Sequence, residues 1–191
     1  MAVEIKNGLI RFQILNTQQH QKLIDQGVEL ISEKAKDNLM LKHKKRELKR
    51  MARRGHLVGL VEISGDGKET LKGIAGTNEI HRRRVLFGRI QFGKIQAAEI
   101  GSVAIAKDYE GNGHGREIVQ ETARAFMNGA SGRNELTEDF MLFAMVKSDN
   151  EASKRMFGKI GNPIDLSALP RRALRFGRDY KGYDITHQGQ I

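Results

Sequence analysis

Closely spaced glycines are the feature of this 191-residue sequence that most directly indicates chemistry. Gly111, Gly113 and Gly115 lie in the stretch EGNGHG (110–115), between an apolar segment and a segment of helical periodicity. Residues without a Cβ atom allow successive backbone N–H groups to point into one concavity, and the positive end of a following helix points to the same place. Such an arrangement binds phosphate groups. The alternative interpretation is a simple glycine-rich turn between a strand and a helix.

Several other kinds of site are disfavoured by residue types and spacing. The glycine stretch is not followed by Gly-Lys-Ser/Thr as in a Walker A motif, and it is not a complete GxGxxG fingerprint. The chain has no cysteine, which removes disulfides, Cys-ligated metals and thiol nucleophiles. The six histidines lack metal-ligand spacing, so we expect no metal, and neither Ser102 nor Ser153 has a recognisable triad context.

The first half of the chain predicts strands and helices in mixed order. Residues 9–16 form a short apolar run typical of a strand, and apolar residues at helical spacing follow over 17–36. A second helical stretch covers 37–54. Residues 56–64 and 70–80 then predict two strands joined by the glycine-containing turn GDGKE.

The second half predicts the elements that would flank the glycine stretch. Residues 81–94 either extend the preceding hairpin or form a loop, and 95–107 predict a strand that leads into the glycines. A helix is expected over about 115–129. The nearly continuous apolar run at 139–147 is typical of a strand buried on both faces. A last helix, capped by Asp149 or Asn150, is expected to about Ile160.

Length and composition predict one globular domain over 1–191. The chain is 39% hydrophobic and 29% charged, and no apolar run approaches the 18 or so residues of a membrane span. The N-terminal segment lacks the layout of a signal peptide, so we expect a soluble, cytoplasmic protein that does not associate with membranes. The tail, 162–191, contains both prolines and has no clear structural pattern.

The net charge of +10 suggests an anionic partner, although a general role in solubility is equally compatible. Most of the excess lies in the basic helix expected over 36–55, where residues 42–54 hold eight Lys and Arg and one Glu. A solvated helix face, a docking surface for an acidic substrate and an RNA contact are the alternatives for this segment. HRRR at 81–84 would either extend the basic surface or contact a cofactor phosphate.

Two stretches together resemble the GNAT acetyltransferase superfamily. AAEIGSVAIAKDYEGNGHGREIV (97–119) resembles its pyrophosphate-binding motif, in which a strand, Arg/Gln-x-x-Gly-x-Gly/Ala and a helix follow one another. FMLFAMV followed by NEASKRMFGKIG (150–161) is similar to its second motif. The resemblance implies an α+β fold with a mixed, mostly antiparallel central sheet, two splayed parallel strands at 97–106 and 139–147, and flanking helices.

The resemblance also implies acetyl-CoA as co-substrate and assigns residues to it. Backbone groups of 103–105 would pair with the pantetheine arm, the 110–115 stretch would hold the pyrophosphate, and Asn150 would reach the pantetheine. The residues expected to contact the cofactor are Val103, Ala104, Ile105, Glu110, Gly111, Asn112, Gly113, His114, Gly115, Arg116, Asn150, Ser153 and Phe157. Glu110 departs from the family's Arg or Gln, and an acidic side chain suits a phosphate site only if it points outward.

Glu99 is the candidate general base, because it precedes Gly113 by 14 residues, the offset of a catalytic Glu in the histone-acetyltransferase-like branch. Glu79 and His81 are the reserves. Phe157 stands where many family members have a Tyr that protonates the leaving thiolate, so Tyr180 or Tyr183 would have to fold over the site to replace it.

The sequence thus predicts an N-acyltransferase that transfers acetyl from acetyl-CoA to a primary amine by direct attack in a ternary complex. The alternative is a non-catalytic acyl-CoA-binding regulator or nucleic-acid-associated protein, which Phe157, Glu110 and the basic helix favour. The acceptor is unspecified; an anionic molecule, an RNA and an acidic protein are the alternatives, and a homodimer is also allowed for.

Overall fold

A computed structural model describes residues 2–5, 8–36, 45–86, 89–166 and 179–189. Its strands are β1 (Ala2–Ile5), β2 (Gly8–Ile14), β3 (Leu57–Ser64), β4 (Glu69–Leu86), β5 (Arg89–Ile105), β6 (Leu136–Lys147), β7 (Asn162–Ile164) and β8 (Tyr180–Asp184). Its helices are α1 (Gln21–Lys36), α2 (Lys45–Arg53), α3 (His114–Gly132) and α4 (Glu151–Ile160), with short 3-10 turns η1 (Lys107–Tyr109) and η4 (Thr186–Gly189).

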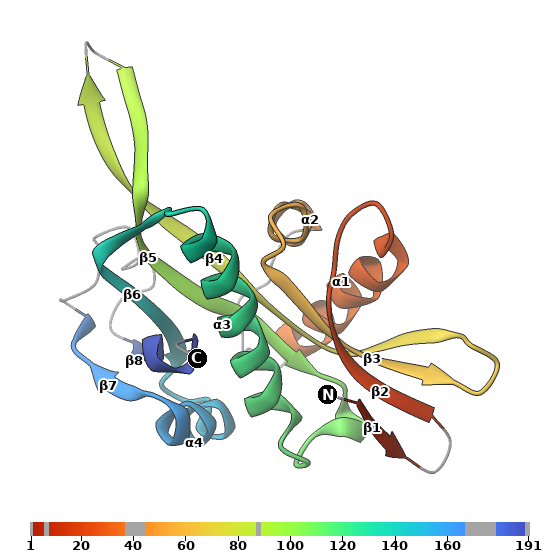
Figure 1. Cartoon of the computed structure of the whole chain (residues 1–191). Coiled ribbons are helices and arrows are strands. Elements are labelled where there is room, and N and C mark those ends of the chain that lie inside the picture. The colour runs from red at the N-terminus through yellow and green to blue at the C-terminus, as the bar shows by residue number, and fades with distance from the viewer. Residues whose placement is uncertain (1, 6–7, 37–44, 87–88, 167–178, 190–191) are drawn as a thin grey trace.

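In the described chain, eight strands form one sheet in the order β1-β2-β3-β4-β5-β6-β8-β7 (Figure 1). Every neighbouring pair is antiparallel except β5 and β6, which are parallel. A parallel pair needs a long crossover, and α3 supplies it between β5 and β6. The mixed, mostly antiparallel sheet expected from the sequence is confirmed.

Helices cover both faces of the sheet. Apolar residues of α1 and α2, including Ile24, Ile31 and Leu48, are buried against β3 and β4. The apolar stripe of α3, including Val119 and Phe126, packs with α4 against the opposite face of β5 and β6. Figure 1 shows α3 crossing the sheet along its length. The amphipathic periodicity of each helix therefore determines which layer it forms.

Close helix packing explains a glycine in the middle of α1. A Cβ atom built at Gly27 would overlap Cδ1 of Ile74 on β4 and would lie 3.3 Å from Cδ2 of Leu71. Such a contact is far inside van der Waals distance, so a side chain here would push α1 away from the sheet or displace Ile74. Glycine costs helix stability, and close approach to the sheet compensates for it.

The two parallel strands separate part of the way along. Their pairing runs from Ile95 opposite Leu136 to Glu99 opposite Phe143. Beyond Glu99, β5 continues to Ile105 and β6 to Lys147 without further pairing between them in the described residues. The splayed strands that the sequence predicts are present, and the gap opens immediately after Glu99.

A β-bulge accompanies the separation of the strands. Ile74 pairs with Ala104 and Gly76 with Gly101, so β5 has one more residue than β4 between these pairs. Ser102 lies within this interval and has φ of 57°, a left-handed conformation that is uncommon for residues other than glycine. Across the bulge, the alternation of side chains along β5 shifts by one residue. The α3 side is contacted before the bulge by Ala98 and Ile100, and after it by Val103 and Ile105.

Some elements differ from the sequence prediction. Residues 81–86 and 89–94 extend the β4–β5 hairpin, with Arg83 opposite Phe92 and Leu86 opposite Arg89, so the first of the two alternatives for this stretch is the one observed in its described residues. The sequence pattern did not reveal β1, which adds to the sheet edge at β2. The tail contributes β7, β8 and η4, while 37–44 and 167–178, within the predicted second helix and the tail, lie outside the described residues.

Candidate functional site

The glycine stretch forms an anion-binding loop at the start of α3. Gly111 and Gly113 have positive φ values of 79° and 87°, and Gly113 is the N-cap of the helix. Within the described residues, no acceptor is found for the backbone N–H groups of 111–115, whereas Arg116 and Glu117 donate theirs to the Gly113 carbonyl. The unpaired donors and the positive end of a 19-residue helix meet at this loop. It is suited to a phosphate or pyrophosphate.

Glu110 points away from this loop. Its carboxylate pairs with Lys34 of α1, which resolves the charge conflict expected from an acidic residue beside phosphates. Its backbone N–H donates to the Lys107 carbonyl at 3.3 Å. Glu110 therefore has no free donor for a cofactor phosphate and is not among the proposed cofactor contacts.

The ring side chains around the loop have internal partners. His114 Nδ1 lies 3.0 Å from Glu117 Oε2. Tyr109 donates its hydroxyl proton to Glu62 at 2.6 Å, and this hydrogen bond lowers the pKa of Glu62. Arg116 is exposed one residue beyond Gly115. Arg116 is therefore the cation best placed to add to the backbone donors.

The α4 residues of the second motif follow the end of β6, and two of them cap that helix. Asn150 is the N-cap of α4, and its side-chain oxygen accepts the Ser153 N–H at 3.0 Å. A Cβ atom at Gly115 would lie 3.2 Å from Sδ of Met156, so the start of α3 lies against the middle of α4. The structure thereby brings the two sequence motifs together, although the Asn150 side-chain oxygen serves as a helix cap.

Glu99 lies at the mouth of the gap on the α2 face of the sheet. It pairs with Asn78 on one side and Phe143 on the other. Paired residues share a face, and Asn78 accepts a hydrogen bond from Arg50 of α2 at 2.9 Å. The Glu99 side chain therefore lies on the side opposite α3, next to the basic helix.

Tyr180 lies on the same face as Glu99. It pairs with Lys147 on β6. Side chains alternate along a strand, so Lys147, four residues after Phe143, lies on the same face as Phe143. Phe143 in turn pairs with Glu99 and shares its face. Burial raises the pKa of the Tyr180 phenol, and the negative charges of Asp149, Asp179 and Glu99 raise it further. The Glu99 carboxylate and the Tyr180 hydroxyl are thus within electrostatic reach of each other.

The other aromatic residues considered for the site lie in the core. Phe157 of α4 and Tyr183 of β8 stack on each other with ring centroids 6.0 Å apart, and both are buried in the cluster on the α3 side. Tyr183 faces away from Glu99, because it pairs with Ala144 on the other face of β6. Of the two reserve tyrosines, only Tyr180 lies near the candidate base.

The two reserve bases belong to a separate buried cluster. Glu79 is 5% exposed and contacts Arg54, His56 Nδ1 at 3.3 Å and His81 Nε2 at 2.9 Å. It pairs with Ala98, on the α3 face, and is therefore on the opposite side of the sheet from Glu99. The ion pair with Arg54, the two histidine contacts and this position leave Glu79 and His81 unsuited to act at the same point as Glu99.

His56 is the most perturbed histidine of the cluster. Its side chain is 2% exposed, and its ring meets Phe126 edge to face at 4.9 Å. Burial lowers the pKa of His56 to about 4, with a contribution from the positive charges of Arg133 and Arg54. It is therefore a neutral core residue at physiological pH, and nothing in its sequence context indicated this.

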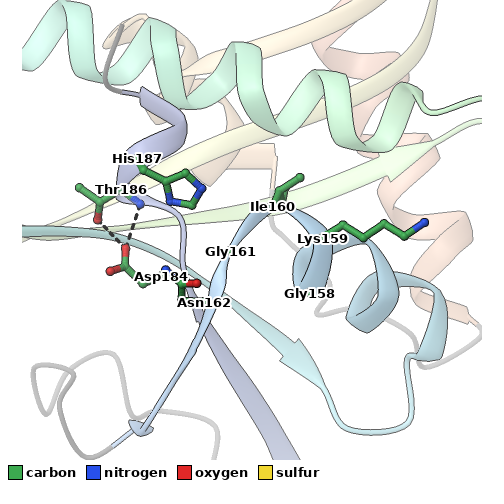
Figure 2. Close-up of a pocket in the computed structure, with 8 residues that line it drawn as sticks. All are labelled: Gly158, Lys159, Ile160, Gly161, Asn162, Asp184, Thr186 and His187. Carbon is green, nitrogen blue, oxygen red and sulfur yellow. Dashed lines mark hydrogen bonds between the residues drawn. The ribbon is translucent and has the colours of Figure 1, made fainter.

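A separate polar cavity of about 430 Å³ lies beside the C-terminal end of α4 (Figure 2). Asp184 lines it, with its carboxylate accepting hydrogen bonds from the Thr186 hydroxyl at 2.6 Å and the Thr186 N–H at 2.9 Å. A carboxylate and the negative end of a helix disfavour phosphate binding. Its lining residues are Gly158, Lys159, Ile160, Gly161, Asn162, Asp184, Thr186 and His187, none of which the sequence assigned to the cofactor.

The described residues contain neither a cluster of metal-ligating side chains nor a helix that could span a membrane. No group of three or more His, Asp or Glu side chains is arranged to hold a metal ion in this part of the chain. Likewise, no helix among the described elements combines the length and the apolar character required to cross a bilayer.

Comparison with solved structures identifies the fold. An acetyltransferase of the GNAT family from Staphylococcus aureus Mu50 superposes with a TM-score of 0.61 at 10% identity, covering 92% of this chain and 99% of that chain. A chain of the NatC complex bound to Gag peptide and CoA superposes with a TM-score of 0.59 at 15% identity, covering 92% and 95%. N-acetylglutamate synthase from Neisseria gonorrhoeae, complexed with coenzyme A and N-acetyl-glutamate, gives 0.60 at 14% identity and 92% coverage of this chain, which spans 34% of the synthase chain.

At the level of sequence, no protein-family model and no curated protein matches the chain. The structural matches, all well below 25% identity, show a common fold. This chain has the GNAT-type α+β fold that its two motifs indicated.

Proposed function

We propose that the protein is an acyl-CoA-dependent N-acyltransferase that transfers acetyl from acetyl-CoA to a primary amine. The observation that carries the proposal is the course of β5, which leaves β6 immediately after Glu99 and leads through η1 to the 111–115 loop. Along this path the candidate base comes first, then an edge without a neighbouring strand, then the phosphate-binding loop. The thioester, the pantetheine arm and the pyrophosphate follow one another in the same order in acetyl-CoA.

The cofactor would be held mainly by backbone groups. In this proposal the N–H groups of Gly111, Asn112, Gly113, His114 and Gly115 bind the pyrophosphate, with Arg116 adding a positive charge. The edge of Val103–Ile105 that faces the gap pairs with the amides of the pantetheine, as an added strand would. Asn150 and Ser153, at the start of α4, follow the end of β6 and would approach the pantetheine from there.

Glu99 would act as the general base. A free alkylamine is mostly protonated at neutral pH, so its proton must be removed before nitrogen attacks the thioester carbonyl carbon. Glu99 accepts this proton, directly or through one water, on the α2 face where an acceptor enters. As the C–N bond forms, the nitrogen becomes cationic and loses a second proton to water. The C–S bond then breaks, and the thiolate leaves.

The bulge in β5 is suited to stabilising the developing oxyanion. Strained backbone conformations are concentrated at functional sites, and Ser102 adopts one at the point where the gap opens. We assign the donor to a backbone N–H between Ser102 and Ala104, turned toward the gap by the bulge. Such a preorganised donor is worth about 2.7–4 kcal/mol in a comparable oxyanion site.

Tyr180 would stabilise the leaving thiolate in place of the phenol that Phe157 lacks. Its raised pKa keeps the hydroxyl protonated at neutral pH. Full proton transfer to sulfur would be uphill, because a thiol pKa of about 8.5 is lower than that of the phenol. Tyr180 therefore donates a hydrogen bond to the thiolate, and water completes its protonation.

The second candidate function is a non-catalytic acyl-CoA-binding regulator. The burial of Phe157 in the core favours it, since the position that supplies a phenol in many GNAT proteins contributes only packing here. Calorimetric titration with acetyl-CoA, followed by thiol-release assays over a panel of primary amines, separates the two functions. Thiol release that depends on an amine supports the enzyme, binding without release supports the regulator, and absence of acetyl-CoA binding contradicts both.

A further inference from the structure

The net positive charge of the chain is concentrated in two segments. Residues 42–54 hold eight Lys and Arg and one Glu, and residues 81–94 hold five Lys and Arg and no acidic residue. Their combined charge of +12 exceeds the +10 of the whole chain, so the other residues are slightly acidic in sum. The basic character of this protein is therefore a local property.

The described part of the first segment presents its cations outward. Arg46, Arg50 and Arg53 of α2 are exposed, and Lys49 is half-buried. Within the described residues none of the four forms an ion pair with a carboxylate, whereas Lys45 pairs with Asp25. Unpaired, clustered cations on one short helix repel one another and are stabilised by an external anion.

The second segment is the outer half of the β4–β5 hairpin, which extends beyond the rest of the sheet (Figure 1). Pairing of β3 with β4 ends at Gly76, and pairing of β5 with β6 begins only at Ile95, while β4 and β5 pair out to Leu86 and Arg89. This arm therefore has two strands. A two-stranded ribbon is marginally stable alone, and a partner along it would stabilise it.

The two segments adjoin at β4. Arg50 of α2 donates to Asn78 at 2.9 Å, and the arm departs from the sheet two to three residues later, at His81. Asn78 is in turn paired with Glu99. The α2 cations, the base of the arm and the mouth of the gap thus lie side by side.

We propose that α2 and the β4–β5 arm form a surface that binds the phosphate backbone of a single-stranded nucleic acid. Eight of the thirteen basic residues in the two segments are arginine, whose planar guanidinium matches phosphate geometry. The sequence of the arm also includes Phe92, opposite Arg83, and cations combined with aromatic residues are typical of single-strand binding. A second copy of this chain is a poorer occupant, because it would place like charges against each other.

The test uses the full chain and a fluorescein-labelled 20-nucleotide oligouridylate, with anisotropy measured from 50 to 200 mM KCl. About six phosphate contacts predict a loss of affinity of a few hundredfold over this range. The triple variant Arg46→Ser, Lys49→Ser, Arg53→Ser removes three cations and should reduce the slope of log K against log salt by about two. Replacing Arg82, Arg83, Arg84 and Arg89 by Ser should reduce it by a similar or larger amount.

The matched control is Lys68→Ser, Arg155→Ser, Lys159→Ser, which removes the same charge from exposed positions at the β3–β4 turn and on α4, away from this surface. Circular dichroism and thermal unfolding identify any variant that fails to fold. Equal weakening by the control, no RNA binding at 50 mM KCl, or equal affinity for polyglutamate would overturn the proposal. A DNA oligothymidylate and an RNA duplex, assayed in parallel, distinguish the forms of nucleic acid, and tighter binding to the duplex would overturn the single-strand assignment.

Discussion

Glu99 and Tyr180 lie on the same face of the sheet, on opposite sides of the gap between β5 and β6. Glu99 is the last β5 residue paired with β6, and Tyr180 is paired with Lys147 at the far end of β6. The negative charge of Glu99 contributes to raising the pKa of the Tyr180 phenol. A carboxylate that accepts a proton and a phenol that remains protonated are the complementary pair needed for aminolysis of a thioester.

Replacing Glu99 by Gln should lower kcat by about 10²–10⁴ at neutral pH, because the amide cannot accept the proton of the attacking amine. Part of the rate should return above about pH 10, where alkylamines lose their proton unaided. The measurement is the pH dependence of amine-dependent thiol release. Glu138→Gln, which removes an exposed carboxylate from β6, is the control. Full kcat for Glu99→Gln across the pH range would exclude the base role.

Replacing Tyr180 by Phe should lower kcat about 10–100-fold, the worth of a hydrogen bond to a charged group. The dissociation constant of acetyl-CoA should stay within about twofold. Tyr183→Phe is the matched control, since it leaves the ring that stacks on Phe157 in place. Equal losses of kcat in the two variants would contradict the assignment, and single-turnover thiol release is the most direct measurement.

Replacing Gly113 by Ala should weaken acetyl-CoA binding about tenfold or more. Gly113 has φ of 87°, and a Cβ atom in the left-handed region costs roughly 1–2 kcal/mol or forces the loop to change. Gly132→Ala, at the other end of α3 where a Cβ atom meets nothing within 4 Å, is the control. Isothermal titration calorimetry compares the two, and unchanged affinity for the Gly113 variant would mean that the loop does not bind the cofactor.

His56 predicts a specific dependence of stability on pH. In the folded protein its pKa is lowered to about 4, whereas an unfolded histidine titrates near 6.5. As the pH falls from 6.5 to 4, the unfolded chain takes up a proton that the folded chain does not, so stability is lost across this window. The shift corresponds to about 3 kcal/mol.

Urea unfolding at pH 7 and pH 4 tests this dependence in the wild type and in His56→Leu. The difference in unfolding free energy between the two proteins should change by about 3 kcal/mol in favour of the variant as the pH is lowered. The neighbouring charges of Glu79, Arg54 and Arg133 are present in both proteins, so their own effects cancel to first order. A constant difference would show that His56 is protonated in the folded state.

The sequence predicted what depends on local patterns. Glycine spacing at 111–115 and the helical periodicity after it placed the anion-binding loop, and the apolar run of β6 placed the strand that splays from β5. The parting of the strands and the mixed sheet also agree with the prediction. The loop and its helix depend on residues that are close together in the sequence, whereas the parting of the strands and the mixed sheet were expected from the resemblance to the GNAT superfamily.

What the sequence did not predict depends on long-range register. Tyr180 reaches the Glu99 face because β8 pairs with β6 in one particular register, and the preceding tail has no pattern that fixes it. The left-handed Ser102 follows Gly101 within a strand, a combination that signals a bulge only weakly. Glu79 was a candidate base from its chemistry alone, and the ion pair with Arg54 is evident only in three dimensions.

The position at which acetyl-CoA binds is the most direct test of the proposed cofactor site along β5 and the 111–115 loop. Titration of ¹⁵N-labelled protein with acetyl-CoA, followed through backbone amide resonances, measures this without an acceptor amine. The largest chemical-shift changes should occur at Gly111–Gly115 and Val103–Ile105, where donors are unpaired and β5 borders the gap. Changes confined to Gly158–Asn162 and Asp184–His187, around the cavity beside α4, would contradict the account.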